Sequence, residues 1–137
     1  MIPNAALGAA VAAWATSESS VPIGWLLPPE PPAWPHGILE PFGQTPNTRT
    51  LLVRSGHAVQ DWRLTIAART PESLHMSLDR VSRILATRIR EIAPVPFEGD
   101  TVQLTRMQLR GSGYQRIPSD SEVFAAAVLL ESMITLT

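Results

Sequence analysis

The segment from Gln60 to Ile92, QDWRLTIAARTPESLHMSLDRVSRILATRIREI, decides the fold class of this chain. Up to Arg69 it alternates between apolar and polar residues, which is the pattern of a strand with one buried and one solvated face. The apolar positions of this strand are Trp62, Leu64, Ile66 and Ala68, and the polar positions are Asp61, Arg63, Thr65 and Arg69.

A long amphipathic helix is predicted directly after this strand. Thr70 is a good N-cap, Pro71 suits the first helical turn, and Glu72 suits the positive end of the helix dipole. The apolar residues that follow recur at spacings of three and four, and they are Leu74, Leu78, Val81, Leu85, Ile89 and Ile92. Such a stripe predicts a helix with one buried side. A strand followed by such a helix predicts an α+β fold in which the helix lies on a sheet.

Three further segments are predicted to be strands of the same sheet. Thr50 to Arg54 is a strand that reaches the first one through a turn at Ser55–His57, so the two form a hairpin. Thr101 to Arg110 is a strand whose alternation slips, which predicts a bulge at Thr105–Arg106. Ser121 to Leu136 fits a helix by its alanines and a strand by its alternation, and we interpret it as a strand.

The N-terminal residues 1–20 contain an alanine-rich apolar run from Ala5 to Ala15. A signal peptide is one reading of this run, but no Lys or Arg precedes it, as such a signal requires. The run is also too short to span a bilayer. We therefore predict a short N-terminal helix that begins near Asn4.

Residues 21–48 form a proline-rich arm, with eight of the chain's thirteen prolines. Such a segment cannot be a helix or a central strand, and it should run extended. It could serve as a PxxP ligand for an SH3-type groove. The alternative is an arm that Trp25 and Trp34 hold against its own domain, which we favour. We expect short extended pieces at Gly24–Leu27 and Gly37–Phe42 to pair with the sheet.

These elements predict one domain over residues 1–137, because this length is enough for a substantial core. It comprises the N-terminal helix (1–20), the proline-rich arm (21–48) and a sheet–helix core (49–137). The expected fold is α+β, with a small mixed or antiparallel sheet of four to five strands covered by one long helix.

Charge is unevenly distributed along the chain, although the net charge is only −1. All eleven basic residues are Arg and lie between Arg49 and Arg116, where six acidic residues leave an excess of five positive charges. The two flanks hold six acidic residues and no basic ones. A near-neutral chain has no overall attraction to nucleic acid or acidic membranes. The Arg set suits bidentate pairing at protein interfaces, or it reflects a GC-rich genome.

Groups that carry chemistry are few in this sequence. There is no Cys, which removes disulfides, thiol nucleophiles and Cys-based metal sites. The histidines His36, His57 and His75 have no metal-ligand spacing, and Gly111-Ser112-Gly113 matches neither a nucleophile elbow nor a phosphate loop. We expect no enzyme activity, no cofactor and no metal site. The Arg-bearing side of the long helix lacks interleaved aromatic residues, which favours a solvated or protein-binding face over nucleic-acid binding.

The order of elements carries a resemblance to a known family. An Ala-rich helix and a Pro-rich run lead into Gly37–Gly43, then into the strand Val59–Arg69, the helix Pro71–Ile92 and the strand pair within Thr101–Leu136. This order resembles the tail terminator proteins of siphovirus-like, long-tailed bacteriophages, also called minor capsid or tail completion proteins. The resemblance covers most of the chain.

The resemblance implies a structural protein of the virion, assembled in the host cytoplasm. Members of this family form a ring, usually a hexamer, that caps the tail tube and joins it to the head–tail connector. The implied partners are further copies of the chain, the major tail tube protein and the connector or stopper protein. DNA would meet the chain only by passage through the ring lumen, and no membrane is involved.

Two alternatives remain at this point. One is another phage neck protein, such as the stopper of the connector, which has a similar size and also forms rings. The other is a small ligand-binding or enzymatic α/β domain, which would need a pocket with convergent polar groups.

The candidate assembly interface comprises Arg80, Arg83, Trp25, Trp34 and Tyr114. Opposed charges on one chain favour head-to-tail contacts, which close into a ring when the rotation allows. We expect the Arg side chains to act on register and encounter, and the tryptophans to supply most of the affinity.

Overall fold

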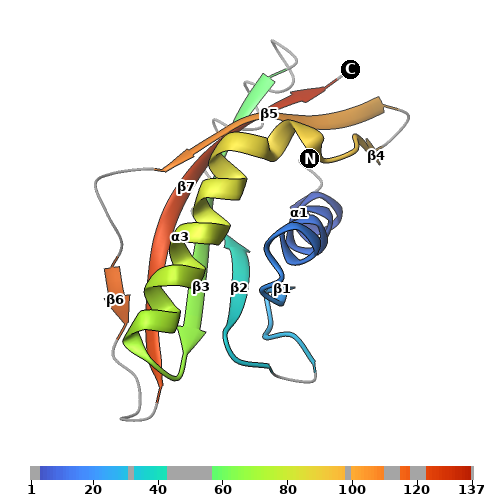
Figure 1. The fold of residues 1–137 in the computed structure, drawn as a ribbon. Helices are drawn as coiled ribbons and strands as arrows, with labels where there is room; N and C mark the ends of the chain where they lie inside the picture. The colour runs from blue at the N-terminus through green and yellow to red at the C-terminus, as the bar shows by residue number, and fades with distance from the viewer. Residues whose placement is uncertain are drawn as a thin grey trace.

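The fold is α+β, with helices packed on one face of a curled, mixed sheet (Figure 1). The structure is a computed structural model that describes residues 4–30, 33–42, 57–97, 100–109, 115–117 and 123–136. Its elements are α1 (Asn4–Ser19), β1 (Ile23–Trp25), β2 (His36–Pro41), β3 (His57–Ala68), α3 (Pro71–Arg88), the 3-10 turn η1 (Ile89–Glu91), β4 (Val95–Phe97), β5 (Asp100–Leu109), β6 (Gln115–Ile117) and β7 (Phe124–Leu136).

The sheet is larger than the four to five strands expected. Seven strands pair in the described residues, in the order β1-β2-β3-β7-β5-β4, and β6 pairs with β7 off this path. The arm accounts for part of the difference, because both of its expected extended pieces contribute a strand, β1 and β2. The first piece is only partly a strand, since β1 ends at Trp25 and Leu26 and Leu27 form a bend after it. β1 and β2 are parallel, and the other pairs are antiparallel. The predicted strand Thr50–Arg54 lies outside the described residues.

The β3–α3 unit confirms the predictions made for it. The inward side chains of β3, Trp62, Leu64, Ile66 and Ala68, are completely buried. The hydroxyl of Thr70 accepts a hydrogen bond from Ser73 N at 3.1 Å, as an N-cap does. The α-helix ends at Arg88, earlier than expected, because η1 replaces its last turn before Pro94. Even so, the whole predicted stripe from Leu74 to Ile92 is buried.

The strands β5 and β7 complete the centre of the core. The register of their pairing shifts between Leu104 and Arg106, so the predicted bulge is present. It returns Met107 to the buried side that already holds Val102 and Leu104. The last segment is the strand β7, which pairs with β3 over twelve residue pairs.

Helix α1 lies inside the curl of the sheet (Figure 1), where it contacts β1, β2, α3 and β4. Leu7 and Val11 are fully buried against the core. The helix therefore belongs to the same packed unit as α3. No helix in the described ranges is both long enough and apolar enough to cross a membrane.

Candidate assembly surfaces

The turn after β1 displays two leucines, which we call the apolar tip (Leu26 and Leu27). Leu26 is 51% exposed and Leu27 72% exposed. Leu26 has a positive φ of 68°, which is rare for a bulky residue, and its N–H donates to Leu39 O at 2.9 Å. A side chain at Gly24 would meet Leu27 O at 1.9 Å, so this turn requires glycine there. The backbone thus holds both leucines in one tight turn.

Trp25, the residue before the apolar tip, packs against the core. Its ring lies edge-on to Trp62, with centroids 5.7 Å apart, and a Cβ on Gly8 of α1 would come within 2.3 Å of it. Its indole nitrogen is buried and has no hydrogen-bond partner in the described part of the chain. Trp25, a predicted interface residue, therefore packs within its own subunit, as the packed-arm interpretation expected.

Trp34, the second predicted interface tryptophan, lies just before β2. It is 39% exposed, and its ring lies 4.7 Å from that of His36 and 5.0 Å from the guanidinium carbon of Arg69. His36 Nδ1 lies 2.8 Å from Ala33 O. These contacts hold Trp34 against the start of β2 and against Arg69, the residue after β3, while part of the indole stays accessible.

The remaining histidines do not gather around His36. His75 is exposed on α3. His57 was expected in a turn, but it is the first residue of β3. Among the described residues, no group of three or more His, Asp or Glu side chains is placed to hold a metal ion.

An open hollow of about 440 Å³ lies between the end of α1, the arm and the first half of α3. We call it the α3 groove, and it is lined by Ser20, Val21, Pro35, Thr70, Glu72, Ser73, Met76, Ser77 and Arg80. Met76 is 69% exposed, so the groove presents an apolar side chain to solvent. Its lining is mixed: three side chains are apolar, Glu72 and Arg80 are charged, and the other four carry hydroxyls.

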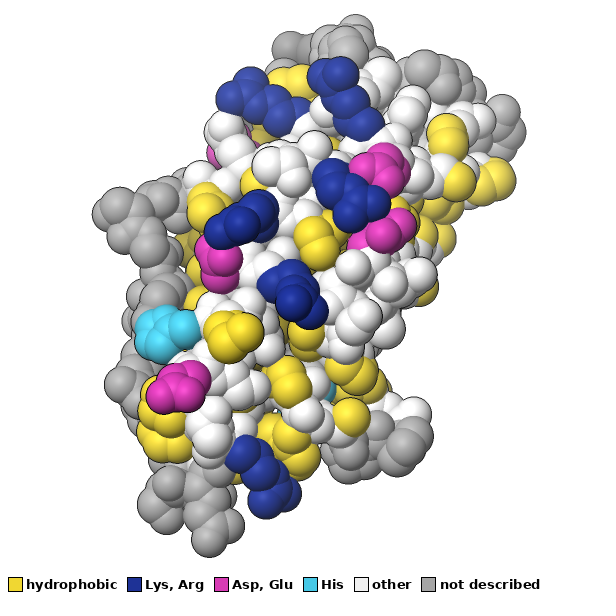
Figure 2. Space-filling model, in the orientation of Figure 1, with side chains coloured by type: hydrophobic (Ala, Val, Ile, Leu, Met, Phe, Trp, Pro, Cys, Tyr) yellow, Lys and Arg dark blue, Asp and Glu magenta, His cyan; other side chains and the backbone are white. Residues whose placement is uncertain are grey.

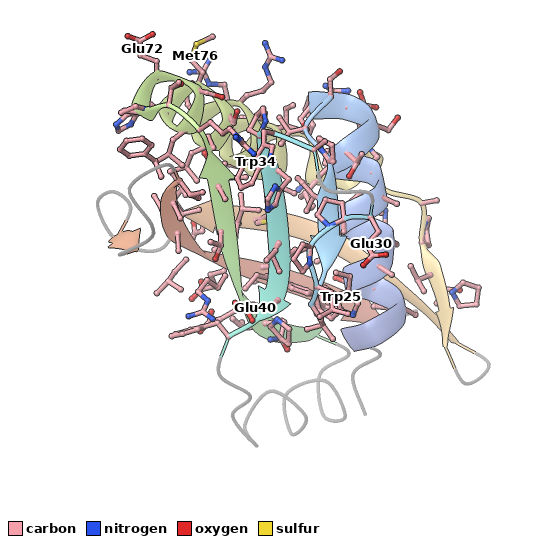
Figure 3. The ribbon with its side chains drawn as sticks, turned by 90° about the horizontal axis from the view of Figure 1, so that it is seen from below. Trp25, Glu30, Trp34, Glu40, Glu72 and Met76 are labelled. Atoms are coloured by element: carbon pink, nitrogen blue, oxygen red, sulfur yellow. The ribbon has the colours of Figure 1, made fainter. Side chains whose placement is uncertain are left out.

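The apolar tip and the α3 groove lie at opposite ends of the parallel β1–β2 pair. β1 runs parallel to β2, with Ile23 opposite Gly37 and Trp25 opposite Leu39, so the start of β1 lies near Pro35 and its end near Glu40. Figure 3 shows the same separation, with Trp25 and Glu40 at one end and Glu72 and Met76 at the other.

Arginine and acidic side chains interleave on the molecular face that carries α3 (Figure 2). Arg83 pairs with Asp79 at 2.7 Å, and Arg88 pairs with Glu18 at 3.1 Å and with Glu91 at 2.6 Å. Hydrogen bonding to Glu91 and Glu18 raises the pKa of Arg88, and hydrogen bonding to Arg88 lowers the pKa of Glu91. These exposed pairs satisfy one another within the subunit, and each contributes little to stability.

Arg80 differs from Arg83, although both were predicted interface residues. Its Nη1 donates to Ser19 O at 3.3 Å, and no described carboxylate lies within ion-pair distance of it. Glu30 of the arm is likewise in no ion pair within the described part of the chain, whereas Glu18 pairs with Arg88 and Glu40 with Arg63. Tyr114, the last predicted interface residue, lies outside the described residues.

The sequence singled out the arginines and tryptophans but missed the apolar tip and the groove. The signal for the tip was Gly24 followed by two leucines before a proline pair. Nothing in the sequence showed that Pro35 would line the same hollow as Met76, because those residues are far apart in the chain.

The fold is similar to that of solved structures over nearly the whole chain. One is a chain from the virion of a native gene transfer agent particle, with a TM-score of 0.65, 15% identity, and coverage of 98% of both chains. A second solved structure has a TM-score of 0.56 and 12% identity, and the match covers 96% of this chain and 92% of that one. No family model matches the sequence. No curated protein matches it either.

Proposed function

We propose that this chain is a structural subunit of a phage-like virion, and in particular a tail terminator. In this role, copies form a ring, expected to be a hexamer, that caps the tail tube and joins it to the head–tail connector. The observation that carries the proposal is the end-to-end similarity of fold to a chain from a gene transfer agent virion. The order of elements in the sequence points to the same class.

The surfaces of the subunit support this role. A ring needs two different patches on each copy, because a head-to-tail contact joins one patch to the other. The apolar tip and the α3 groove are two such patches at opposite ends of the β1–β2 pair. The role needs no catalytic group, cofactor or metal, and duplex DNA would meet the subunit only in the ring lumen.

The test is a capping experiment with the major tail tube protein from the same genome. Tubes assembled with this chain should carry a ring at one end in electron micrographs and should stop growing there. Tubes that stay bare and elongate equally with and without the chain would contradict the terminator role. Rings that bind the portal-side connector but ignore tubes would support the alternative role of a stopper.

A further inference from the structure

The apolar tip is an unusual feature for an isolated subunit. Two adjacent leucines at 51% and 72% exposure leave much of their apolar surface in water, where it does not stabilise the fold. The positive φ of Leu26 adds backbone strain, which persists where the surrounding structure enforces it. The turn is enforced here by Gly24, Trp25 and the hydrogen bond to Leu39 O.

The α3 groove is an open hollow whose lining mixes apolar and polar side chains. Its volume of about 440 Å³ falls in the range of sites that hold compact apolar groups. Val21, Pro35 and Met76 supply apolar wall, and Met76 is itself 69% exposed. An apolar side chain that enters here removes its own surface and that of Met76 from water.

The charged side chains beside the tip and in the groove indicate which segment enters the groove. Arg80 lies in the groove without a carboxylate partner in the described part of the chain, and Glu30 follows the tip without a basic one. In Figure 3, Glu30 lies on the side of Trp25, away from Met76. Among the described residues, an acid that is in no ion pair therefore accompanies the tip, and a base that is in no ion pair lies in the groove.

We propose that the apolar tip of one copy enters the α3 groove of the next copy, with Glu30 of the first paired to Arg80 of the second. This contact rests on the ring of the proposed function and names the surfaces that would close it. It is head-to-tail, since the patch that one copy contributes differs from the patch that the next copy contributes.

The spacing of the four groups is compatible. Glu30 is three positions after Leu27 in the chain, so their Cα atoms are at most about 11 Å apart. Met76 and Arg80 are one helical turn apart, about 6 Å along α3. A leucine against Met76 thus leaves Glu30 within reach of the long Arg80 side chain.

Glu72 restricts the register of this contact. It lines the same groove about 12 Å along α3 from Arg80, given a rise of about 1.5 Å per residue. A tip that entered one or two turns nearer the helix start would bring Glu30 towards Glu72, and like charges disfavour that arrangement.

The first test reverses the charges. Glu30→Arg and Arg80→Glu should each weaken self-association by about tenfold or more in sedimentation equilibrium at low salt. The double variant should recover most of that loss, because it restores the pair with reversed sign. Arg83→Glu is the matched control, since Arg83 lies one turn away and already pairs with Asp79.

The second test separates the two patches. Leu27→Ser removes the tip, with Leu109→Ser as the control at another exposed leucine. Neither the Leu27→Ser chain nor the Leu109→Ser chain should have a lower free energy of unfolding than the unaltered chain. A Leu27→Ser chain mixed with an Arg80→Glu chain should give pairs that stop at two copies, because one intact tip and one intact groove remain.

The outcomes distinguish this contact from the ring itself. Failure of the double charge variant to recover, or equal effects of Arg80→Glu and Arg83→Glu, would overturn the tip–groove contact. Rings that form normally from Leu27→Ser would also overturn it while leaving the terminator proposal standing. An unaltered chain that never associates would overturn both.

Discussion

The β3–α3 unit and the first part of the arm, residues 21–30, use their apolar side chains in opposite ways. In the unit, every inward residue of β3 and every residue of the α3 stripe is nearly or completely removed from water. In the arm, Val21 and Ile23 are buried, but Leu26 and Leu27 face solvent. The first region holds the fold together, and the second leaves two leucines exposed for the contact proposed above.

The backbone shows the same contrast. Thr70 starts α3 from an ordinary extended conformation and caps it with its own hydroxyl. Leu26 takes a left-handed conformation that a leucine rarely adopts. Local preference and tertiary structure agree in the unit and disagree in the arm, as expected where a segment has a role beyond stability.

The largest effect expected is on the core. Leu78→Ala or Leu85→Ala should lower the free energy of unfolding by roughly 2–5 kcal/mol, because each leaves a cavity at a buried site. Denaturant titration measures this, and Met76→Ala on the exposed side of the same helix is the control. Unchanged midpoints in both core variants would mean that the stripe does not face the core.

A buried hydrogen-bond pair gives the next effect. Trp62 Nε1 donates to Ser132 Oγ at 2.6 Å, and Ser132 Oγ donates to Gln60 O at 3.0 Å. Ser132→Ala should cost about 1–3 kcal/mol, because the buried indole N–H loses its acceptor. Adding Trp62→Phe removes the donor, so in denaturant titrations Ser132→Ala should cost less in that background. Equal costs in both backgrounds would exclude coupling between these two side chains.

The helix cap has a smaller effect. Thr70→Ala should destabilise the subunit by about 1 kcal/mol, since the N–H of Ser73 loses its acceptor. Thr87→Ala on the exposed side of α3 serves as the control, because its hydroxyl bonds only to Arg83 O. A Thr70 variant as stable as the control would show that the cap is unimportant.

The smallest effect is expected from the histidines. Replacing His36, His57 and His75 together by Ala should leave assembly and tube capping intact, apart from a stability loss at the buried His36. Loss of capping by a triple variant that still folds and assembles would support an enzymatic or metal-dependent role.

Sequence patterns predicted the parts of the fold in which side chains near in sequence act together. The stripe from Leu74 to Ile92, the Thr70 cap and the slip after Leu104 are local patterns, and each appears as expected. The arm strands β1 and β2 were also anticipated, because short apolar pieces lie between the prolines.

Pairs that meet across the fold could not be predicted in this way. Ser132 is one polar residue in an apolar strand, and only the β3–β7 register brings it to Trp62. Arg80 and Arg83 differ in the group that each contacts. The four-residue spacing of Asp79 and Arg83 indicates their ion pair, whereas no spacing indicates the contact of Arg80 with Ser19 O. The α3 groove depends on how α1, the arm and α3 pack together.

The central claim is that copies of this chain associate head to tail into a closed ring. The most direct measurement is the mass of the purified chain by light scattering across a dilution series, with electron microscopy of the same fractions. The account predicts one discrete assembly of several copies, seen as rings with an open centre. A monomer at every concentration, or a dimer that adds no further copies, would contradict it.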